Sequence, residues 1–187
     1  MNFPILSSLI LLPTIGAFFL LLSTDKKTNT LKYVSLFTSF VNFLISIYLW
    51  ILFDPSTSNF QFIEDREWLK GFVNYKVGID GISILFIILT TFITPICIIS
   101  VNNSIKNNLR DFLIAILVME SLMIGVFCSL DLVIFYLFFE AGLIPMFLII
   151  GIWGGERRVY SAFKFFLYTL LGSVLMLVAI ISIYWIS

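Results

Sequence analysis

Six long apolar runs, separated by polar segments, dominate the chain. Each run holds about 20 residues or more, which at about 1.5 Å per residue in an α-helix is enough to cross the roughly 30 Å hydrocarbon core of a bilayer. The pattern therefore predicts an all-α fold, an integral membrane bundle of six transmembrane helices that forms a single domain over residues 1–187. The expected helices cover about 4–22, 31–53, 81–101, 111–129, 131–152 and 159–186.

The connections between the runs are short, with one exception. Asp54-Pro55 ends the second run, because the residue before a proline disfavours helix. Residues 54–80 then form the one long polar connection, with five acids against three bases. Asp80, at its end, is well placed to cap the N-terminus of the third helix. Only Leu130-Asp131 separates the fourth and fifth runs, which predicts a tight antiparallel pair of helices.

The composition supports the membrane assignment and excludes several functions. The chain is 60% hydrophobic and 12% charged, with net charge +0 and a mean hydropathy of +1.10, far from the values of a soluble domain. Histidine is absent, and Cys97 and Cys128 fall in separate apolar runs. We therefore expect no haem, zinc or iron–sulfur site and no disulfide in this chain. The basic residues are not interleaved with aromatics in a polar groove, so nucleic acid is not an expected partner.

Basic residues are unequally shared between the loops. The connections after the first, third and fifth helices carry seven lysines and arginines, and the opposite loops carry three. By the positive-inside bias, the first set faces the cytoplasm or matrix and both termini face the other side. Met1-Asn2-Phe3 is uncharged and no cleavage pattern or arginine-rich leader follows, so we expect the first helix to be retained. The seven bases are Lys26, Lys27, Lys32, Lys106, Arg110, Arg157 and Arg158.

Glu140 is the main candidate for chemistry. It follows the turn at Leu130 by ten residues, so it lies roughly 15 Å deep, near the bilayer midplane. A charged side chain there costs at least about 2.5–3.5 kcal/mol, so an acid at this depth needs a function or a partner. Pro145 leaves the carbonyl of Ala141 without its helical donor, and Gly142 adds no bulk. The pattern is typical of a proton or ion path, although a neutral carboxyl hydrogen-bonded to another helix would also fit.

Two further ionisable residues lie inside predicted helices. Glu120 is about as far before the turn as Glu140 is after it, so the two acids are expected at similar depth. Glu120 either carries protons itself or tunes the protonation of Glu140. Lys164 lies about five residues into the sixth helix, where it could belong to a proton path but is better placed to extend towards the interface. The predicted constellation is thus an acid pair at the midplane without a base.

Particular segments of the chain resemble a known family. These are YKVGIDGISILFIILTTFITPICI, the hairpin FLIAILVMESLMIGVFCSLDLVIFYLFFEAGLIPMFLIIGIWG, and FKFFLYTLLGSVLML. They resemble the amino-terminal part of chain 4 of respiratory NADH:ubiquinone oxidoreductase (complex I), mitochondrial type, from about residue 40 onward. The resemblance implies an antiporter-like proton-pumping subunit of the membrane arm. It also implies that Glu140 and Glu120 match the family's acids on the fifth and fourth helices, whereas no required role carries over to Lys164.

The resemblance also implies a missing part. Members of the family have roughly fourteen helices in two inverted repeats, and the lysine that pairs with the fifth-helix glutamate lies on the next, broken helix. We expect either a second polypeptide that carries the remainder of chain 4 or a shortened subunit with a structural role. In the first case, Gly172 and Ser173 on the sixth helix would let a partner helix approach closely. A subunit of a cation/proton antiporter complex is a third possibility.

The expected surroundings follow from the same resemblance. The partners are other membrane-arm subunits of complex I and membrane lipid, and NADH, flavin, iron–sulfur clusters and ubiquinone would bind to other subunits. The use of 21 phenylalanines with many isoleucines and asparagines fits AT-rich organelle coding. The mitochondrial inner membrane is therefore favoured over a bacterial plasma membrane.

Overall fold

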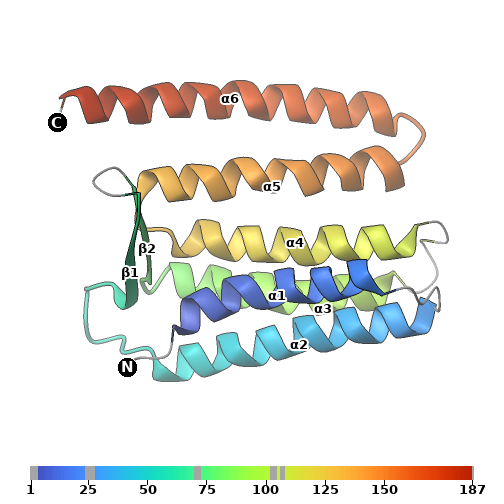
Figure 1. Cartoon of the computed structure of the whole chain (residues 1–187), viewed down its shortest axis with the longest axis horizontal. Helices are drawn as coiled ribbons and strands as arrows, with labels where there is room; N and C mark the ends of the chain where they lie inside the picture. Colours follow the sequence, from blue (N-terminus) through green and yellow to red (C-terminus); the bar gives the residue numbers. More distant parts are fainter. Residues whose placement is uncertain (1–3, 24–27, 70–72, 102–104, 106–107, 187) are drawn as a thin grey trace.

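The computed structural model describes residues 4–23, 28–69, 73–101, 105 and 108–186. Within these ranges, six helices are long and apolar enough to cross a membrane, which confirms the predicted bundle. They lie side by side, with both ends of the chain at the same end of the bundle (Figure 1). The helices are α1 (Ile5–Leu22), α2 (Thr28–Leu52), α3 (Ser83–Ser100), α4 (Leu109–Cys128), α5 (Leu132–Trp153) and α6 (Arg158–Ile186).

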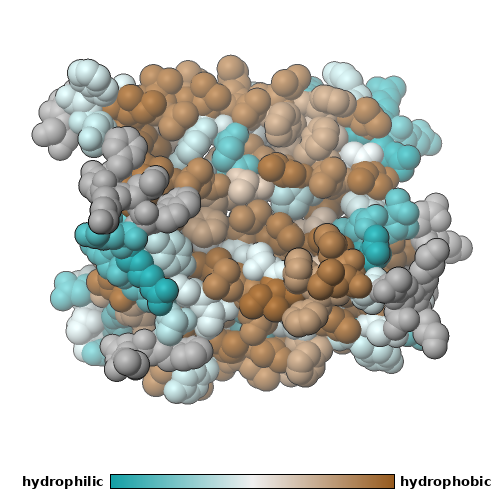
Figure 2. Space-filling view, viewed as in Figure 1, coloured by the Kyte–Doolittle hydropathy of each residue, from teal (hydrophilic) through white to brown (hydrophobic). Residues whose placement is uncertain are grey.

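The polar ends of the bundle agree with a membrane-spanning arrangement. A hydrophobic band covers the middle of the molecule, and hydrophilic residues gather at its two ends (Figure 2). Arg110 and Arg158 lie in the first turns of α4 and α6, and Lys32 lies in the second turn of α2. All three helices begin slightly earlier than expected. The three residues therefore lie at the end opposite the two chain termini. Lys26, Lys27, Lys106 and Lys70 fall outside the described residues.

The long polar connection contains a β-hairpin, which was not predicted from the sequence. Strands β1 (Gln61–Leu69) and β2 (Val73–Ile79) pair antiparallel with two register irregularities. The hairpin lies beside the turn between α4 and α5 (Figure 1). Leu130 N–H donates to the carbonyl of Lys76 over 2.9 Å, and Val77 forms a bridge with Ser129. The hairpin forms because its backbone groups pair with each other and with this turn.

The hairpin also closes the N-terminal end of α1. Pro4 precedes α1 and provides no side-chain cap. Glu64 on β1 does so instead, accepting hydrogen bonds from the backbone N–H groups of Leu6 (2.9 Å) and Ser7 (3.3 Å) and from the Ser7 hydroxyl. A carboxylate at this position satisfies free N–H groups and complements the helix dipole. The polar segment thus has a structural role at the membrane boundary.

Caps set the starts of two other helices. Asp80 accepts from the backbone N–H of Ser83 (2.7 Å) and that of Ile82 (3.2 Å), which confirms the predicted cap of α3. The backbone hydrogen bond from Ser83 is the main cause of the lowered pKa of Asp80. Asp131 accepts from the backbone N–H of Val133 at the start of α5. The turn between α4 and α5 is therefore held by two contacts: Asp131 caps α5, and Leu130 is hydrogen-bonded to Lys76 of the hairpin.

Two buried clusters hold α1–α4 together. The first lies at the hairpin end and joins α1–α4 to β2, and the second lies at the opposite end of the same helices. Ser35, Ser39, Asn42 and Ser46 form a buried polar face of α2 between these apolar contacts. The first cluster consists of Leu6, Leu9, Ile10, Leu49, Val77, Ile79, Ile84, Ile87, Ile124 and Cys128, and the second of Ala17, Leu20, Leu31, Ile98, Val101, Leu109, Leu113 and Leu117.

Helices α5 and α6 extend the bundle on one side only. α5 packs on α4 at Gly125, where a Cβ would come within 2.5 Å of the Phe138 ring. α6 packs along α5, and Ala162 and Ser173 are its buried contacts among the described side chains. In their most apolar stretches, 44% of the residues of α4 are buried, against 17% in α5 and 6% in α6. The outer side of this pair is thus left uncovered by the chain.

Candidate proton-carrying site

Glu120 lies inside the bundle, on the side of α4 that faces α2. Its exposed fraction is 2%. The side-chain Nδ2 of Asn42 on α2 donates to Glu120 Oε1 over 2.9 Å. Among the described residues, no ion pair reaches this carboxyl. A buried carboxyl with an amide partner and no cation is more stable in its neutral form, because desolvation penalises the charge.

Asn42 belongs to the buried polar face of α2 defined above. Its members follow one another by four, three and four residues, so they lie on one side of the helix. One turn from Asn42, the hydroxyl oxygens of Ser46 and of Thr91 on α3 are 2.7 Å apart. This polar face was not predicted from the sequence, although polar residues spaced by three and four within an apolar run indicate one side of a helix.

The pair formed by Asn42 and Glu120 is incompletely hydrogen-bonded. Asn42 Oδ1 and Glu120 Oε2 are both buried without a partner among the described residues. Buried polar groups in proteins are nearly always paired, so two unpaired acceptors on adjacent side chains call for a donor. Glu120 also lines a cavity of about 310 Å³ between α3 and α4, which contains Thr90 and Thr94.

Glu140 occupies a different environment on α5. Its side chain is half-buried, and its Oε2 atom is buried without a hydrogen-bond partner among the described residues. Pro145, five residues on, is buried within α5, so the carbonyl of Ala141 lacks its helical donor. A Cβ on Gly142 would meet nothing within 4 Å. The backbone next to Glu140 is therefore open to a neighbouring helix or to water.

The structure gives the two acids different neighbours. Glu120 is bonded to α2, whereas the contact of α5 with α4 passes through Gly125 and Phe138. No hydrogen bond between Glu120 and Glu140 is found in the described part of the chain. The two carboxyls thus lie on neighbouring helices and share no hydrogen bond in the described ranges, and their similar depth stays a prediction.

Lys164 lies in the second turn of α6, and its side chain is exposed. In the described ranges, it forms no ion pair with either glutamate. Its position fits a side chain that extends from α6 towards the membrane interface. Among the described residues, no base forms an ion pair with Glu140.

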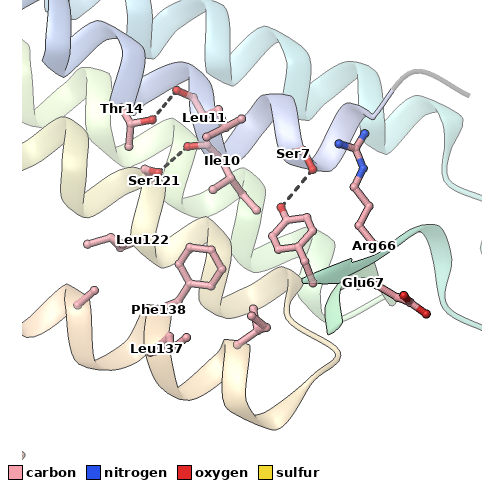
Figure 3. Close-up of a pocket in the computed structure, with 13 residues that line it drawn as sticks. Ser7, Ile10, Leu11, Thr14, Arg66, Glu67, Ser121, Leu122, Leu137 and Phe138 are labelled. Carbon is pink, nitrogen blue, oxygen red and sulfur yellow. Dashed lines mark hydrogen bonds between the residues drawn. The ribbon is translucent and has the colours of Figure 1, made fainter. Parts of the chain in front are cut away.

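A larger cavity of about 780 Å³ lies between α1, α4, α5 and the hairpin (Figure 3). Ile10, Leu122 and Phe138 are among its many apolar lining residues. Polar groups occur mainly at the hairpin end, where the Ser7 hydroxyl lies 3.1 Å from the Tyr75 hydroxyl, and burial raises the pKa of Tyr75. A cavity with largely apolar walls suits acyl chains or apolar side chains better than a chain of water molecules.

Among the described residues, no group of three or more cysteines, aspartates or glutamates could hold a metal ion. Cys97 and Cys128 are both free, the first exposed and the second buried. The candidate chemistry therefore lies in the carboxyls of Glu120 and Glu140.

Carboxyls buried in a bundle of membrane-crossing helices, beside a proline-interrupted helix, occur in ion-transporting membrane proteins. Residues 129–187 fit a family model described as NADH:quinone oxidoreductase/Mrp antiporter, TM. Glu140 lies inside this matched region, and Glu120 lies before it.

Curated relatives give the more particular match. The chain is 60% identical over 153 residues to NADH-quinone oxidoreductase subunit M of Rhodobacter capsulatus, which covers 82% of the chain and 30% of that protein. It is 48% identical over 182 residues to NADH-ubiquinone oxidoreductase chain 4 of Marchantia polymorpha, which covers 96% of the chain and 37% of that protein. It is 49% identical over 180 residues to NADH-ubiquinone oxidoreductase chain 4 of Arabidopsis thaliana, and this match covers 95% of the chain and 36% of that protein.

The comparisons confirm the resemblance to chain 4, or subunit M, of NADH:quinone oxidoreductase. The chain spans between 30% and 37% of the length of these three relatives. Like its relatives, it is a multi-pass protein of the mitochondrial inner membrane or a bacterial plasma membrane.

Proposed function

We propose that the chain is a proton-translocating membrane-arm subunit of respiratory NADH:ubiquinone oxidoreductase, and that Glu140 is its main proton carrier. One observation carries the proposal: the Oε2 atom of Glu140 on α5 is buried without a hydrogen-bond partner among the described residues. In addition, a relative of the chain is named as a subunit of this enzyme. Glu120 is the second carrier. The redox reaction itself, with NADH, flavin, iron–sulfur clusters and ubiquinone, takes place on other subunits.

The proposed role of Glu140 follows from its surroundings. A carboxyl inside a membrane protein can take up a proton and pass it on when a cation or a water molecule comes within reach. The free carbonyl of Ala141 and the open space at Gly142 leave room for that approach. The base that receives the proton is not supplied by Lys164, which points to the exposed side of α6.

We further propose that a second polypeptide supplies this base. It carries the remainder of chain 4 and packs against the outer side of α5 and α6, which this chain leaves uncovered. The uncovered side includes Gly172, whose added Cβ would meet nothing within 4 Å. Small residues at such positions let membrane helices pack closely. Other membrane-arm subunits and lipid cover the rest of the bundle.

One alternative is supported by the family model, whose description also includes Mrp antiporters. A subunit of a cation/proton antiporter would use the same two carboxyls. The respiratory assignment is favoured because the three relatives described above are all named as NADH-quinone or NADH-ubiquinone oxidoreductase subunits.

The proposal is tested by Glu140→Gln in the assembled complex. Glutamine keeps the shape and hydrogen bonding of the side chain but cannot carry a proton, so we expect proton translocation coupled to NADH oxidation to fall by at least about tenfold. Translocation would be followed in sealed vesicles with a pH-sensitive dye. Glu140→Asp, which keeps the carboxyl, should retain much more activity.

Two controls separate function from assembly. Native electrophoresis should show normal amounts of complex for Glu140→Gln. Glu156→Gln, an exposed acid after α5, should leave translocation unchanged. If Glu140→Gln assembles and pumps like the wild type, the chain is a structural element and the proposal is wrong.

A further inference from the structure

The contact between Asn42 and Glu120 joins two helices that are far apart in the chain. It is the hydrogen bond that links α2 to the acid of α4, 78 residues away, and both side chains are almost completely buried. We propose that Asn42 is a positioning residue that holds a proton on Glu120, by donating to one carboxyl oxygen and accepting the proton carried by the other. This deepens the proposed function, on which it rests for the role of Glu120 as a carrier.

The geometry requires a donor at this point. The bond from Asn42 Nδ2 to Glu120 Oε1 fixes the amide against the carboxyl. The remaining oxygen of each group, Asn42 Oδ1 and Glu120 Oε2, is buried and unpartnered. Both atoms are acceptors when the carboxyl is ionised, and neither can then satisfy the other. A proton on Glu120 Oε2 turns this oxygen into a donor and completes a cyclic carboxyl–amide pair.

The neighbouring hydroxyls of α2 do not supply the donor. Ser35 donates to the carbonyl of Leu31 over 2.7 Å, and Ser39 donates to that of Leu36 over 3.1 Å. Each hydroxyl has one hydrogen, so these two are already used within α2.

The hydroxyls of the next turn are also engaged. Ser46 lies 2.7 Å from the carbonyl oxygen of Phe43 and 2.7 Å from the Thr91 hydroxyl, which itself lies 3.0 Å from the carbonyl oxygen of Ile87. Their two hydrogens are shared among these contacts. The proton of Glu120 is then the donor that remains for Asn42.

Glu120 has no ion pair among the described residues. The elements packed against α4 are α1, α2, α3, α5 and β2, and none of their described residues forms a salt bridge with this carboxyl. A neutral carboxyl therefore needs no counter-ion here, and the amide supplies both of its partners.

Infrared spectroscopy of the assembled complex in membranes tests the inference. The difference between wild type and Glu120→Gln at neutral pH isolates the signal of Glu120. We expect a carbonyl band of a protonated, hydrogen-bonded carboxyl. In Asn42→Leu, which is similar in size but has no amide, this band should move to the higher frequency of a carboxyl without hydrogen bonds.

A matched control and a rescue variant complete the test. Ser46→Ala, on the same face of α2, should leave the band in place. If Asn42→Leu does not assemble, the exchange Asn42→Asp with Glu120→Gln rebuilds a carboxyl–amide pair with the roles reversed. It should assemble and show a hydrogen-bonded carboxyl band from position 42.

Each remaining outcome is decisive. A carboxylate band from Glu120 at neutral pH would mean that a bridging water supplies the hydrogens, and it would overturn the inference. So would a carboxyl band that Asn42→Leu does not move. The measurement does not depend on pumping, so normal pumping by Glu140→Gln together with the expected band would reject the proposed function and keep the carboxyl–amide pair.

Discussion

The two sides of the bundle are built differently. Helices α1–α4 surround two shared clusters, and Glu120 on α4 accepts a hydrogen bond from Asn42 on α2. Glu64 on β1 caps α1 on the same side. Helices α5 and α6 share one contact surface, and Glu140 on α5 has no hydrogen-bond partner among the described residues. The first side thus encloses its own core, and the second has the features of one half of an interface.

This difference bears on how the chain works. Membrane helices associate through close packing and interhelical hydrogen bonds, because lipid already covers apolar surface well. An uncovered face with a half-buried acid is costly in lipid, so the need for a partner lies at α5 and α6 and not at α1–α4. The following substitutions test this contrast, from the largest expected effect on the chain's own stability to the smallest.

Gly125→Val should have the largest effect. A Cβ at this position would lie 2.5 Å from the Phe138 ring, so the added methyl groups force α5 away from α4. Overpacking of this kind costs about 1–3 kcal/mol or more. We expect a lower thermal midpoint of the complex in detergent and less assembled complex. Phe138→Leu in the same chain should recover part of the loss, and no loss at all would contradict the close contact.

Glu64→Ala should have the next effect. It removes the acceptor for the N–H groups of Leu6 and Ser7 at the start of α1. Loss of a helix cap costs about 0.5–2 kcal/mol, and the thermal midpoint should fall accordingly. Glu67→Ala, an exposed acid on the same strand, is the matched control and should leave the midpoint unchanged. Equal effects of the two variants would show that Glu64 is not a cap.

Asp80→Ala should cost about 1 kcal/mol through the loss of the α3 cap. Because the pKa of Asp80 is lowered in the folded state, its contribution is fully present above the ordinary value of 3.8 and is lost as the pH falls through the folded value. Asp80→Asn keeps a cap but has no charge to titrate. In melting curves between pH 3 and 7, the wild type should lose stability relative to Asp80→Asn only at the acid end.

Gly172→Leu should have almost no effect within the chain, because a Cβ there meets nothing within 4 Å. Its effect should fall on the proposed partner, since a bulky side chain keeps a neighbouring helix at a distance. Affinity purification of this chain would measure how much of the carboxy-terminal polypeptide is retained. Leu171→Ala, an exposed position next to it, is the control. Undiminished retention in Gly172→Leu would move the interface elsewhere.

The sequence was sufficient for the helices and insufficient for their partners. Six apolar runs predict six spans because length and hydropathy alone decide insertion. The hairpin was missed, although Val73, Tyr75, Val77 and Ile79 alternate with other residues as in a strand. The hairpin is hydrogen-bonded to the turn between α4 and α5, and this contact exists only once the helices have packed together.

The candidate site shows the same limit. The position of Glu140 in the fifth run could be derived from its distance to the Leu130 turn, because helix geometry is regular. The partner of Glu120 could not, since Asn42 is 78 residues away and its contact depends on how α2 packs against α4. Depth along the helix also does not specify which side of α4 Glu120 faces, and that side decides its contact with Asn42.

Under the proposed function, this chain provides one half of a proton-carrying site and another polypeptide provides the other half. The most direct test is an experimental structure of the assembled complex. We expect a helix of a second chain to cover the outer side of α5 and α6, and a lysine of that chain to reach the Glu140 carboxyl directly or through one water molecule. A structure in which α6 faces only lipid, or in which no lysine of another chain approaches Glu140, would contradict it.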